Sequence, residues 1–322
     1  MSNVMVGIRL ALRAWPLTVL NYASGLLLGL VGALPFYALW HRALADRPAG
    51  DALLVGLQLM VVGEIGQYDR NSTFALVRAT LLGVLAVGAL VGALVAGGNF
   101  EVLLTARDHS SDHRPFFHRF FRGAGRFFGR NVRLTLLNGI ACLLVGRGIL
   151  AAASAALGPL GESMVAWRAA LPLVVPVALA AVIWLFFFLA QEYARVALVV
   201  EDARSAFRVW VRGLWFVLRG PATPVLAWLV PGLAGLLVTL GVASATWASP
   251  VRTWGGILAL VLAQQLASIF RSWTRVAVAA AALEVGLARG FARPAAPEVP
   301  LVSPPVEAPP AQGPMEMDSP TA

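Results

Sequence analysis

The sequence contains no lysine, a single cysteine and few charged residues of either sign. Charged residues occupy 13% of the 322 positions, about half the fraction that is usual in soluble domains. The single cysteine, Cys142, excludes a disulfide within the chain. The absence of lysine excludes a Walker-type nucleotide-binding loop, which needs a lysine to reach the phosphates.

Signatures of catalysis are also missing. The chain has no HExxH or GxSxG motif, and the glycines of GAGRFFG at 123–129 lack the spacing of a dinucleotide-binding loop. One cluster has residue types that ligate metals, although a solvated loop is its simpler interpretation: Asp108, His109, Asp112, His113 and His118. We therefore expect no enzymatic activity, no cofactor and no bound metal.

Apolar residues, in contrast, make up 59% of the chain, and the mean hydropathy is +0.76. Six apolar stretches are long enough for a helix to cross a bilayer core of about 30 Å. They lie near residues 17–40, 79–100, 134–157, 169–190, 222–247 and 256–270, the last with a helical extension to about residue 288. The pattern predicts an all-α, polytopic transmembrane helix bundle over residues 1–293.

The number of spans depends on a shorter apolar run, Ala52–Gln67, which Glu64 interrupts. Its length suits an interfacial or re-entrant helix, but as a span it would make seven, with the amino terminus outside. Both topologies place about 18 of the 25 arginines in the cytoplasm. We prefer six spans because Glu64 would be costly in hydrocarbon, with both termini cytoplasmic in a bacterial inner membrane. The long apolar run at 17–40 favours an uncleaved span over a signal peptide cleaved after Ala45.

The stretch RPFFHRFFRGAGRFFGRNVR at 114–133 combines arginine with phenylalanine and contains no acid. A helix here places the phenylalanines in one sector and five arginines on the facing one: Arg119, Arg122, Arg126, Arg130 and Arg133. Such a basic amphipathic helix lies in the membrane interface on the cytoplasmic side, with its arginines among anionic lipid head groups. The competing interpretation is a cytoplasmic loop docked on its own bundle.

A second segment, DARSAFRVWVRGLWFVLR at 202–219, repeats this plan. Its arginines share one face and its large apolar residues another: Arg204, Arg208, Arg212 and Arg219 against Phe207, Trp210, Leu214 and Val217. The segments LTVLN at 17–21 and LTLLN at 134–138 suggest three repeated units, starting near residues 1, 114 and 202. Each unit would comprise a basic amphipathic helix and two spans. We expect membrane lipids as partners and no nucleic acid, because no nucleic-acid-binding motif accompanies the net charge of +9.

Polar side chains inside the spans are further candidates for function, namely Arg147, Gln264 and Gln265. They leave two functions open. The first is a non-enzymatic membrane protein that binds lipid or scaffolds a partner through its arginine-rich face. The second is a small-molecule transporter or channel with a polar path near Arg147 and Gln264. The simpler interpretation of the two amides is hydrogen bonding between helices.

Small residues recur at every fourth position in two spans, at Gly25, Gly29 and Ala33 and at Gly88, Gly92 and Ala96. Such spacing predicts that helix backbones approach closely there.

The carboxyl-terminal segment 294–322 differs in composition from the rest. It is rich in proline and carries four acidic residues and no basic one. A segment of this kind cannot bury apolar surface, so we expect a disordered tail.

Several blocks of the chain resemble those of a group of uncharacterised six-span bacterial membrane proteins. They are GGNF at 97–100, FFRGAGRFFGRNVRL at 120–134, QEYARVALVVEDARSAFR at 191–208 and QQLASIFRSWTR at 264–275. The resemblance covers most of residues 97–275. It implies a six-helix bundle, but no activity, partner or site residue, because the group has no established function.

Overall fold

A computed structural model describes residues 2–44, 70–108, 114–157, 166–248 and 254–293. In this part of the chain every regular element is an α-helix: α1 (Ser2–Arg13), α2 (Trp15–Leu44), α5 (Arg70–Arg107), α6 (Phe116–Leu157), α7 (Ala166–Val200), α8 (Ala206–Arg219), α9 (Ala222–Ala248) and α10 (Trp254–Ala288). Six of these helices are long and apolar enough to cross a membrane. The structure thereby confirms the predicted all-α helix bundle, with six candidate membrane spans among the described residues. The run at 52–67 and the tail at 294–322 lie outside the described residues.

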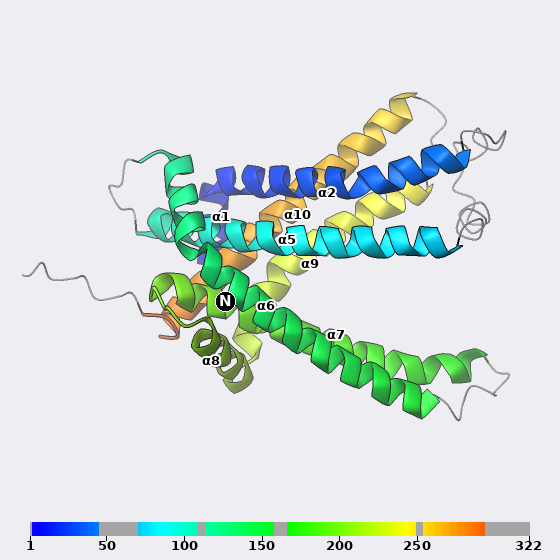
Figure 1. Cartoon of the computed structure of the whole chain (residues 1–322). Coiled ribbons are helices and arrows are strands. Elements are labelled where there is room, and N and C mark those ends of the chain that lie inside the picture. The colour runs from blue at the N-terminus through cyan, green and yellow to red at the C-terminus, as the bar shows by residue number, and fades with distance from the viewer. Residues whose placement is uncertain (1, 45–69, 109–113, 158–165, 249–253, 294–322) are drawn as a thin grey trace, which may run out of the picture.

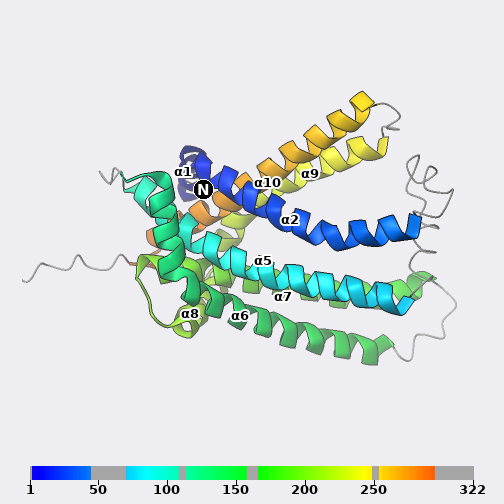
Figure 2. The ribbon, with the colours of Figure 1, turned by 45° about the horizontal axis from the view of Figure 1, so that its top comes forward.

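The helices extend beyond several predicted spans. Helix α5 continues to Arg107 and α7 to Val200, past the predicted ends at 100 and 190, because their last turns are buried against other helices. The predicted interfacial segment 116–133 and the span 134–157 form one continuous helix, α6. Figures 1 and 2 show that the first part of α6 runs at a steep angle to the rest of the helix.

The spans form three hairpins that diverge from one end of the molecule. Each hairpin pairs two spans that follow one another in the chain, α2 with α5, α6 with α7, and α9 with α10. Figure 1 shows the hairpins separating toward the right, while α1, α8 and the start of α6 gather at the left. We call this left-hand end the basic end, because Arg9, Arg122 and Arg208 lie on these three elements.

The three amphipathic elements are α1, residues 116–133 of α6, and α8, and they pack according to one rule. Each contacts the second span of the preceding unit: α6 packs on α5, α8 on α7, and α1 on α10. The second spans α5, α7 and α10 also contact one another. The arrangement is therefore cyclic, with the first unit packed on the last.

A glycine marks the same contact in each of the three units. A Cβ atom added to Gly7 would lie 2.6 Å from the Cα atom of Ala281. One added to Gly123 would lie 2.3 Å from Cβ of Glu101, and one added to Gly213 would lie 2.5 Å from the carbonyl oxygen of Ala190. Such distances leave no room for a side chain. These contacts repeat the unit that the LTVLN and LTLLN segments suggested.

The predicted small-residue stripe does not bring the spans together along its whole length. A Cβ atom added to Gly25, Gly29 or Gly92 would meet nothing within 4 Å. One added to Gly88 would lie 3.2 Å from Cδ2 of Leu28 on α2. A closer approach occurs at the basic end, where a Cβ on Gly98 would lie 2.4 Å from the ring of Phe120. The buried core lies at this end as well, and it includes the alanine-rich part of α10.

Candidate functional site

A cavity of about 510 Å³ lies between the three second spans near the basic end. Equivalent positions of α5, α7 and α10 line it when the helices are aligned on Glu101, Ala194 and Ala281. The backbone nitrogen of Ala194 would lie 3.3 Å from a Cβ atom on Gly213, and the other two residues are those that Gly123 and Gly7 approach. One set of equivalent lining residues is Asn99, Glu192 and Ala279, and another is Val95, Phe188 and Arg275. Helices α2 and α9 complete the wall. We call this space the central cavity.

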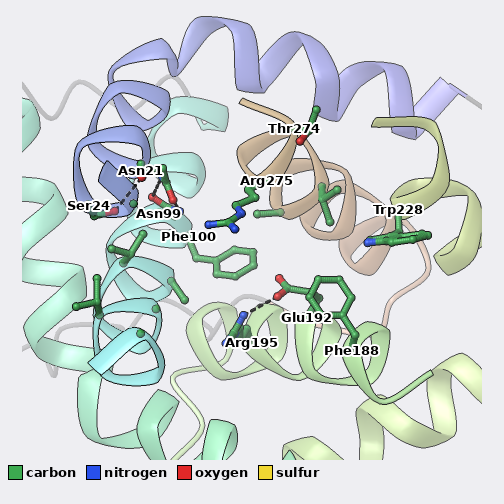
Figure 3. A pocket seen from close by; sticks show the side chains of 18 of the residues that line it. Asn21, Ser24, Asn99, Phe100, Phe188, Glu192, Arg195, Trp228, Thr274 and Arg275 are labelled. Carbon is green, nitrogen blue, oxygen red and sulfur yellow. Dashed lines mark hydrogen bonds and ion pairs between the residues drawn. The ribbon is translucent and has the colours of Figure 1, made fainter. Parts of the chain in front are cut away.

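The central cavity contains three charged side chains, shown in Figure 3. The carboxylate of Glu192 lies 2.5 Å from Nη1 of Arg195, one turn later on α7. Both side chains are largely buried, with 10% and 15% of their surface exposed. Arg275 projects from α10 toward them, and within the described part of the chain its guanidinium has no hydrogen bond or ion pair. The three groups together carry one net positive charge.

Paired amides connect the first and second spans beside the cavity. Asn21 donates from Nδ2 to Oδ1 of Asn99 at 3.1 Å, and Asn99 donates in return at 3.4 Å. In the second unit, Nδ2 of Asn138 donates to Oε1 of Gln191 at 2.9 Å. Asn21 and Asn138 are the last residues of LTVLN and LTLLN, so the two units use the same polar contact.

The remaining wall of the cavity is apolar and aromatic. Phe100, Trp184, Phe188 and Trp228 contribute rings, and Leu28 and Val91 contribute aliphatic groups. Gly25 and Gly92 leave space open beside these side chains, because a Cβ atom at either position would meet nothing within 4 Å.

The polar residues predicted inside the spans lie elsewhere. Arg147 and Gln264 are exposed on the outside of the helices, and neither lines the cavity. Gln265 is half-buried and accepts a hydrogen bond from the hydroxyl group of Tyr22 at 2.6 Å. Glu64, the suggested partner of Arg147, lies outside the described residues.

Three of the nine arginines predicted to contact lipid form ion pairs within the protein. Arg126 and Arg130 donate to the two carboxylate oxygens of Asp202, at 2.9 and 2.6 Å. Partial burial of Asp202 alone would raise its pKa, but these two hydrogen bonds outweigh burial and lower the pKa below its ordinary value. Arg212 binds both oxygens of Glu201, at 2.7 and 3.0 Å, and these hydrogen bonds raise the pKa of Arg212.

The other six arginines differ in their surroundings. Arg119 is half-buried, and the guanidinium of Arg219 lies 5.0 Å from the ring centroid of Trp215, within cation–π range. Four arginines are exposed, and their side chains have no partner among the described residues: Arg122, Arg133, Arg204 and Arg208. These four remain available for an external anion.

The apolar side of each amphipathic element is divided into two strips. On α8, Val209, Gly213 and Val217 are buried, whereas a neighbouring strip is exposed to between 43% and 60%: Phe207, Val211, Trp215 and Leu218. On α6, Phe120 and Phe127 are buried while Phe117 and Phe121 are exposed. The predicted apolar sector of each helix therefore has two different environments. One strip packs on the bundle, and the other lies between it and the arginines.

The cluster considered for a metal is only partly described. His109, Asp112 and His113 lie outside the described residues, and Asp108 and His118 lie within them. The described residues contain no group of three or more histidine, cysteine or acidic side chains that could hold a metal ion.

Comparison of the chain with protein-family models, curated proteins and solved structures found no match. Membership of a six-span family therefore stays a prediction. Sequence reasoning did not single out Glu192, Arg195 or Arg275 as a group. An available signal was the spacing of three residues between an acid and a base in QEYAR, which places both on one helical face just after an apolar run.

Proposed function

We propose that this chain is a non-enzymatic membrane protein that binds anionic lipid at its basic end. One observation carries the proposal: on α6 and α8, an exposed apolar strip lies beside arginines whose side chains have no partner in the described part of the chain. A helix with these neighbouring strips is suited to the membrane interface, where apolar groups enter the acyl region and arginines meet head groups.

Packing on the protein's own bundle accounts for only part of the apolar surface of these helices. It explains the buried strip that includes Val209 and Val217, but it leaves Phe207 and Trp215 exposed to 60% and 56%. Aromatic residues and arginines are the side chains that membrane interfaces favour. The proposed orientation, with the basic end in the cytoplasm of a bacterial cell, follows from the excess of arginine there.

The alternative transport function has less support. Its polar path was expected near Arg147 and Gln264, and neither residue lines the cavity. Binding of lipid needs no such path.

Native mass spectrometry of the detergent-purified chain tests the proposal. We expect more retained phosphatidylglycerol than phosphatidylcholine in the unaltered protein. The triple variant Arg122→Gln, Arg204→Gln and Arg208→Gln should bind phosphatidylglycerol at least about tenfold more weakly, because each base contributes about 1 kcal/mol near an anionic surface. Arg147→Gln, an exposed arginine on the span part of α6, is the matched control and should change nothing. Equal binding of the two lipids, or full retention by the triple variant, would contradict the proposal.

A further inference from the structure

Arg275 places a positive charge in a largely apolar cavity between membrane spans. Its side chain is exposed, so the guanidinium is open to the cavity. An ionised group among apolar walls needs an anion or water to compensate its charge, and it usually marks a functional site. No anionic partner for Arg275 occurs in the described part of the chain. The cavity therefore has a place for an external negative charge.

Each of the other polar side chains around the cavity forms at least one hydrogen bond within the protein. Arg195 donates to Glu192 at 2.5 Å, which neutralises both charges. The amides of Asn21 and Asn99 bind one another, and the hydroxyl group of Thr274 donates to the carbonyl oxygen of Arg271. Arg275 is left as the charged donor that faces the cavity, and a guanidinium offers two parallel N–H groups that match a carboxylate or phosphate.

The apolar wall of the cavity indicates that the anionic group belongs to a ligand with a hydrocarbon part. Trp184, Phe188 and Trp228 line the space next to the charged residues, as Figure 3 shows for Phe188 and Trp228. A cavity of about 510 Å³ is in the usual range for sites that bind small molecules. A hydrophilic anion would leave these rings in contact with water, whereas a hydrocarbon chain would cover them.

We propose that the central cavity binds one amphiphile with a singly charged anionic head group, a carboxylate or a phosphate, held by Arg275. Its hydrocarbon chain lies against Trp184, Phe188 and Trp228. This site is separate from the surface of the amphipathic helices, because none of Arg122, Arg204 and Arg208 lines the cavity.

The test measures binding of oleate to the full-length chain in a neutral detergent by native mass spectrometry. We expect one oleate bound to the unaltered protein, with affinity reduced about tenfold or more in Arg275→Gln, because a charge-assisted hydrogen bond is lost. Arg271→Gln is the matched control. Arg271 lies one turn earlier on α10 and is exposed like Arg275, but it does not line the cavity. This variant should therefore bind oleate like the unaltered protein.

A second variant tests the cavity without changing its charge. Gly92 lines the cavity, and a Cβ atom there would meet nothing within 4 Å, so Gly92→Leu should fold and fill part of the space. We expect this variant to lose oleate binding as well. Thermal unfolding of each variant shows whether it is folded. Arg275→Gln should be as stable as the unaltered protein, because Arg275 has no hydrogen bond or ion pair with any described residue.

Two further ligands identify the source of the anion. Methyl oleate has the chain without the charge and should bind at least about tenfold more weakly than oleate. Inorganic phosphate has the charge without the hydrocarbon chain. Binding of phosphate at Arg275 without binding of oleate would overturn the proposal of an amphiphile and would identify the ligand as a free anion from water. Equal oleate binding by the unaltered protein and Arg275→Gln would overturn the site itself. The triple variant at Arg122, Arg204 and Arg208 should keep oleate binding, so the failure of one proposal is distinguishable from the failure of the other.

Discussion

Nη1 of Arg130 lies 2.6 Å from Oδ1 of Asp202, and the same nitrogen donates to the carbonyl oxygens of Asp202 and Ala203. Arg126 binds the second carboxylate oxygen of Asp202 at 2.9 Å. These contacts fasten α6 to the turn between α7 and α8. Asp202 also has a positive φ of 51°, a conformation in which aspartate and asparagine are several-fold enriched among residues other than glycine.

Two replacements of Asp202 distinguish the contribution of its charge to stability from the contribution of its backbone conformation. Asp202→Asn should lower the free energy of unfolding by about 1 kcal/mol, because it removes two partly exposed ion pairs and keeps a residue that tolerates positive φ. Asp202→Ala should cost about 1–2 kcal/mol more, because alanine is strained in the left-handed region. Thermal unfolding in detergent checks this order of stability, and an alanine variant as stable as the asparagine variant would contradict it.

The same contact predicts how stability depends on pH. The pKa of Asp202 is lower in the folded protein than its ordinary value of about 4. The stabilisation by its charge is therefore complete above that ordinary value and is lost as the pH falls through the lower, folded-state pKa. The difference in stability between the unaltered protein and Asp202→Asn should stay constant between about pH 7 and 5 and shrink below about pH 4. A difference that grows in acid would contradict this assignment.

The glycines between the units should resist substitution. Gly213→Ala would place a Cβ atom 2.5 Å from the carbonyl oxygen of Ala190, so α8 must move away from α7, at a cost of about 1–3 kcal/mol. Gly125→Ala is the matched control, since it also lies in an amphipathic element but its Cβ atom meets nothing within 4 Å. The control should be stabilised by up to about 1 kcal/mol through helix propensity. Unfolding temperatures of the two variants should therefore change in opposite directions.

The amide contact in the second unit should make a modest contribution. Gln191 accepts from Asn138 at 2.9 Å and donates to Oγ1 of Thr135 at 3.1 Å. Gln191→Leu should lower the free energy of unfolding by about 1 kcal/mol, because interhelical hydrogen bonds in membranes average about 0.6 kcal/mol each. Gln264→Leu, at an exposed position, should cost nothing. Equal destabilisation by both variants would show that the amide contact is not responsible.

The spans were predictable because a bilayer imposes a minimum length of apolar sequence. Helix α9 illustrates this, because the span predicted at 222–247 and the helix observed at Ala222–Ala248 differ by one residue. Helices α5 and α7 continue beyond the predicted spans that end at residues 100 and 190, and the apolar length of the sequence did not indicate this continuation. In the structure Glu192 is buried beside Arg195, and a paired charge of this kind can continue a helix inside the protein.

The division of the amphipathic helices was not predictable from apolarity alone. Phe120 and Phe121 are neighbours of the same residue type, yet the first is 1% exposed and the second 58%. A lipid-facing strip and a protein-facing strip both require apolar side chains, so only the position of the glycine contact distinguishes them. The central cavity could not be predicted from the sequence either, because residues more than 250 positions apart, such as Asn21 and Arg275, line it together.

The contact between α1 and α10 joins the two ends of the helical chain. Val4, Leu10 and Ala11 bury their side chains in the core, although the ribosome makes residues 254–288 long after it has released the first helix. Until the hairpin of α9 and α10 is inserted, the ring of helices is therefore incomplete in the nascent protein, and the apolar side of α1 is uncovered. Closure of the circle therefore requires α10, and a chain truncated before α10 would lack it.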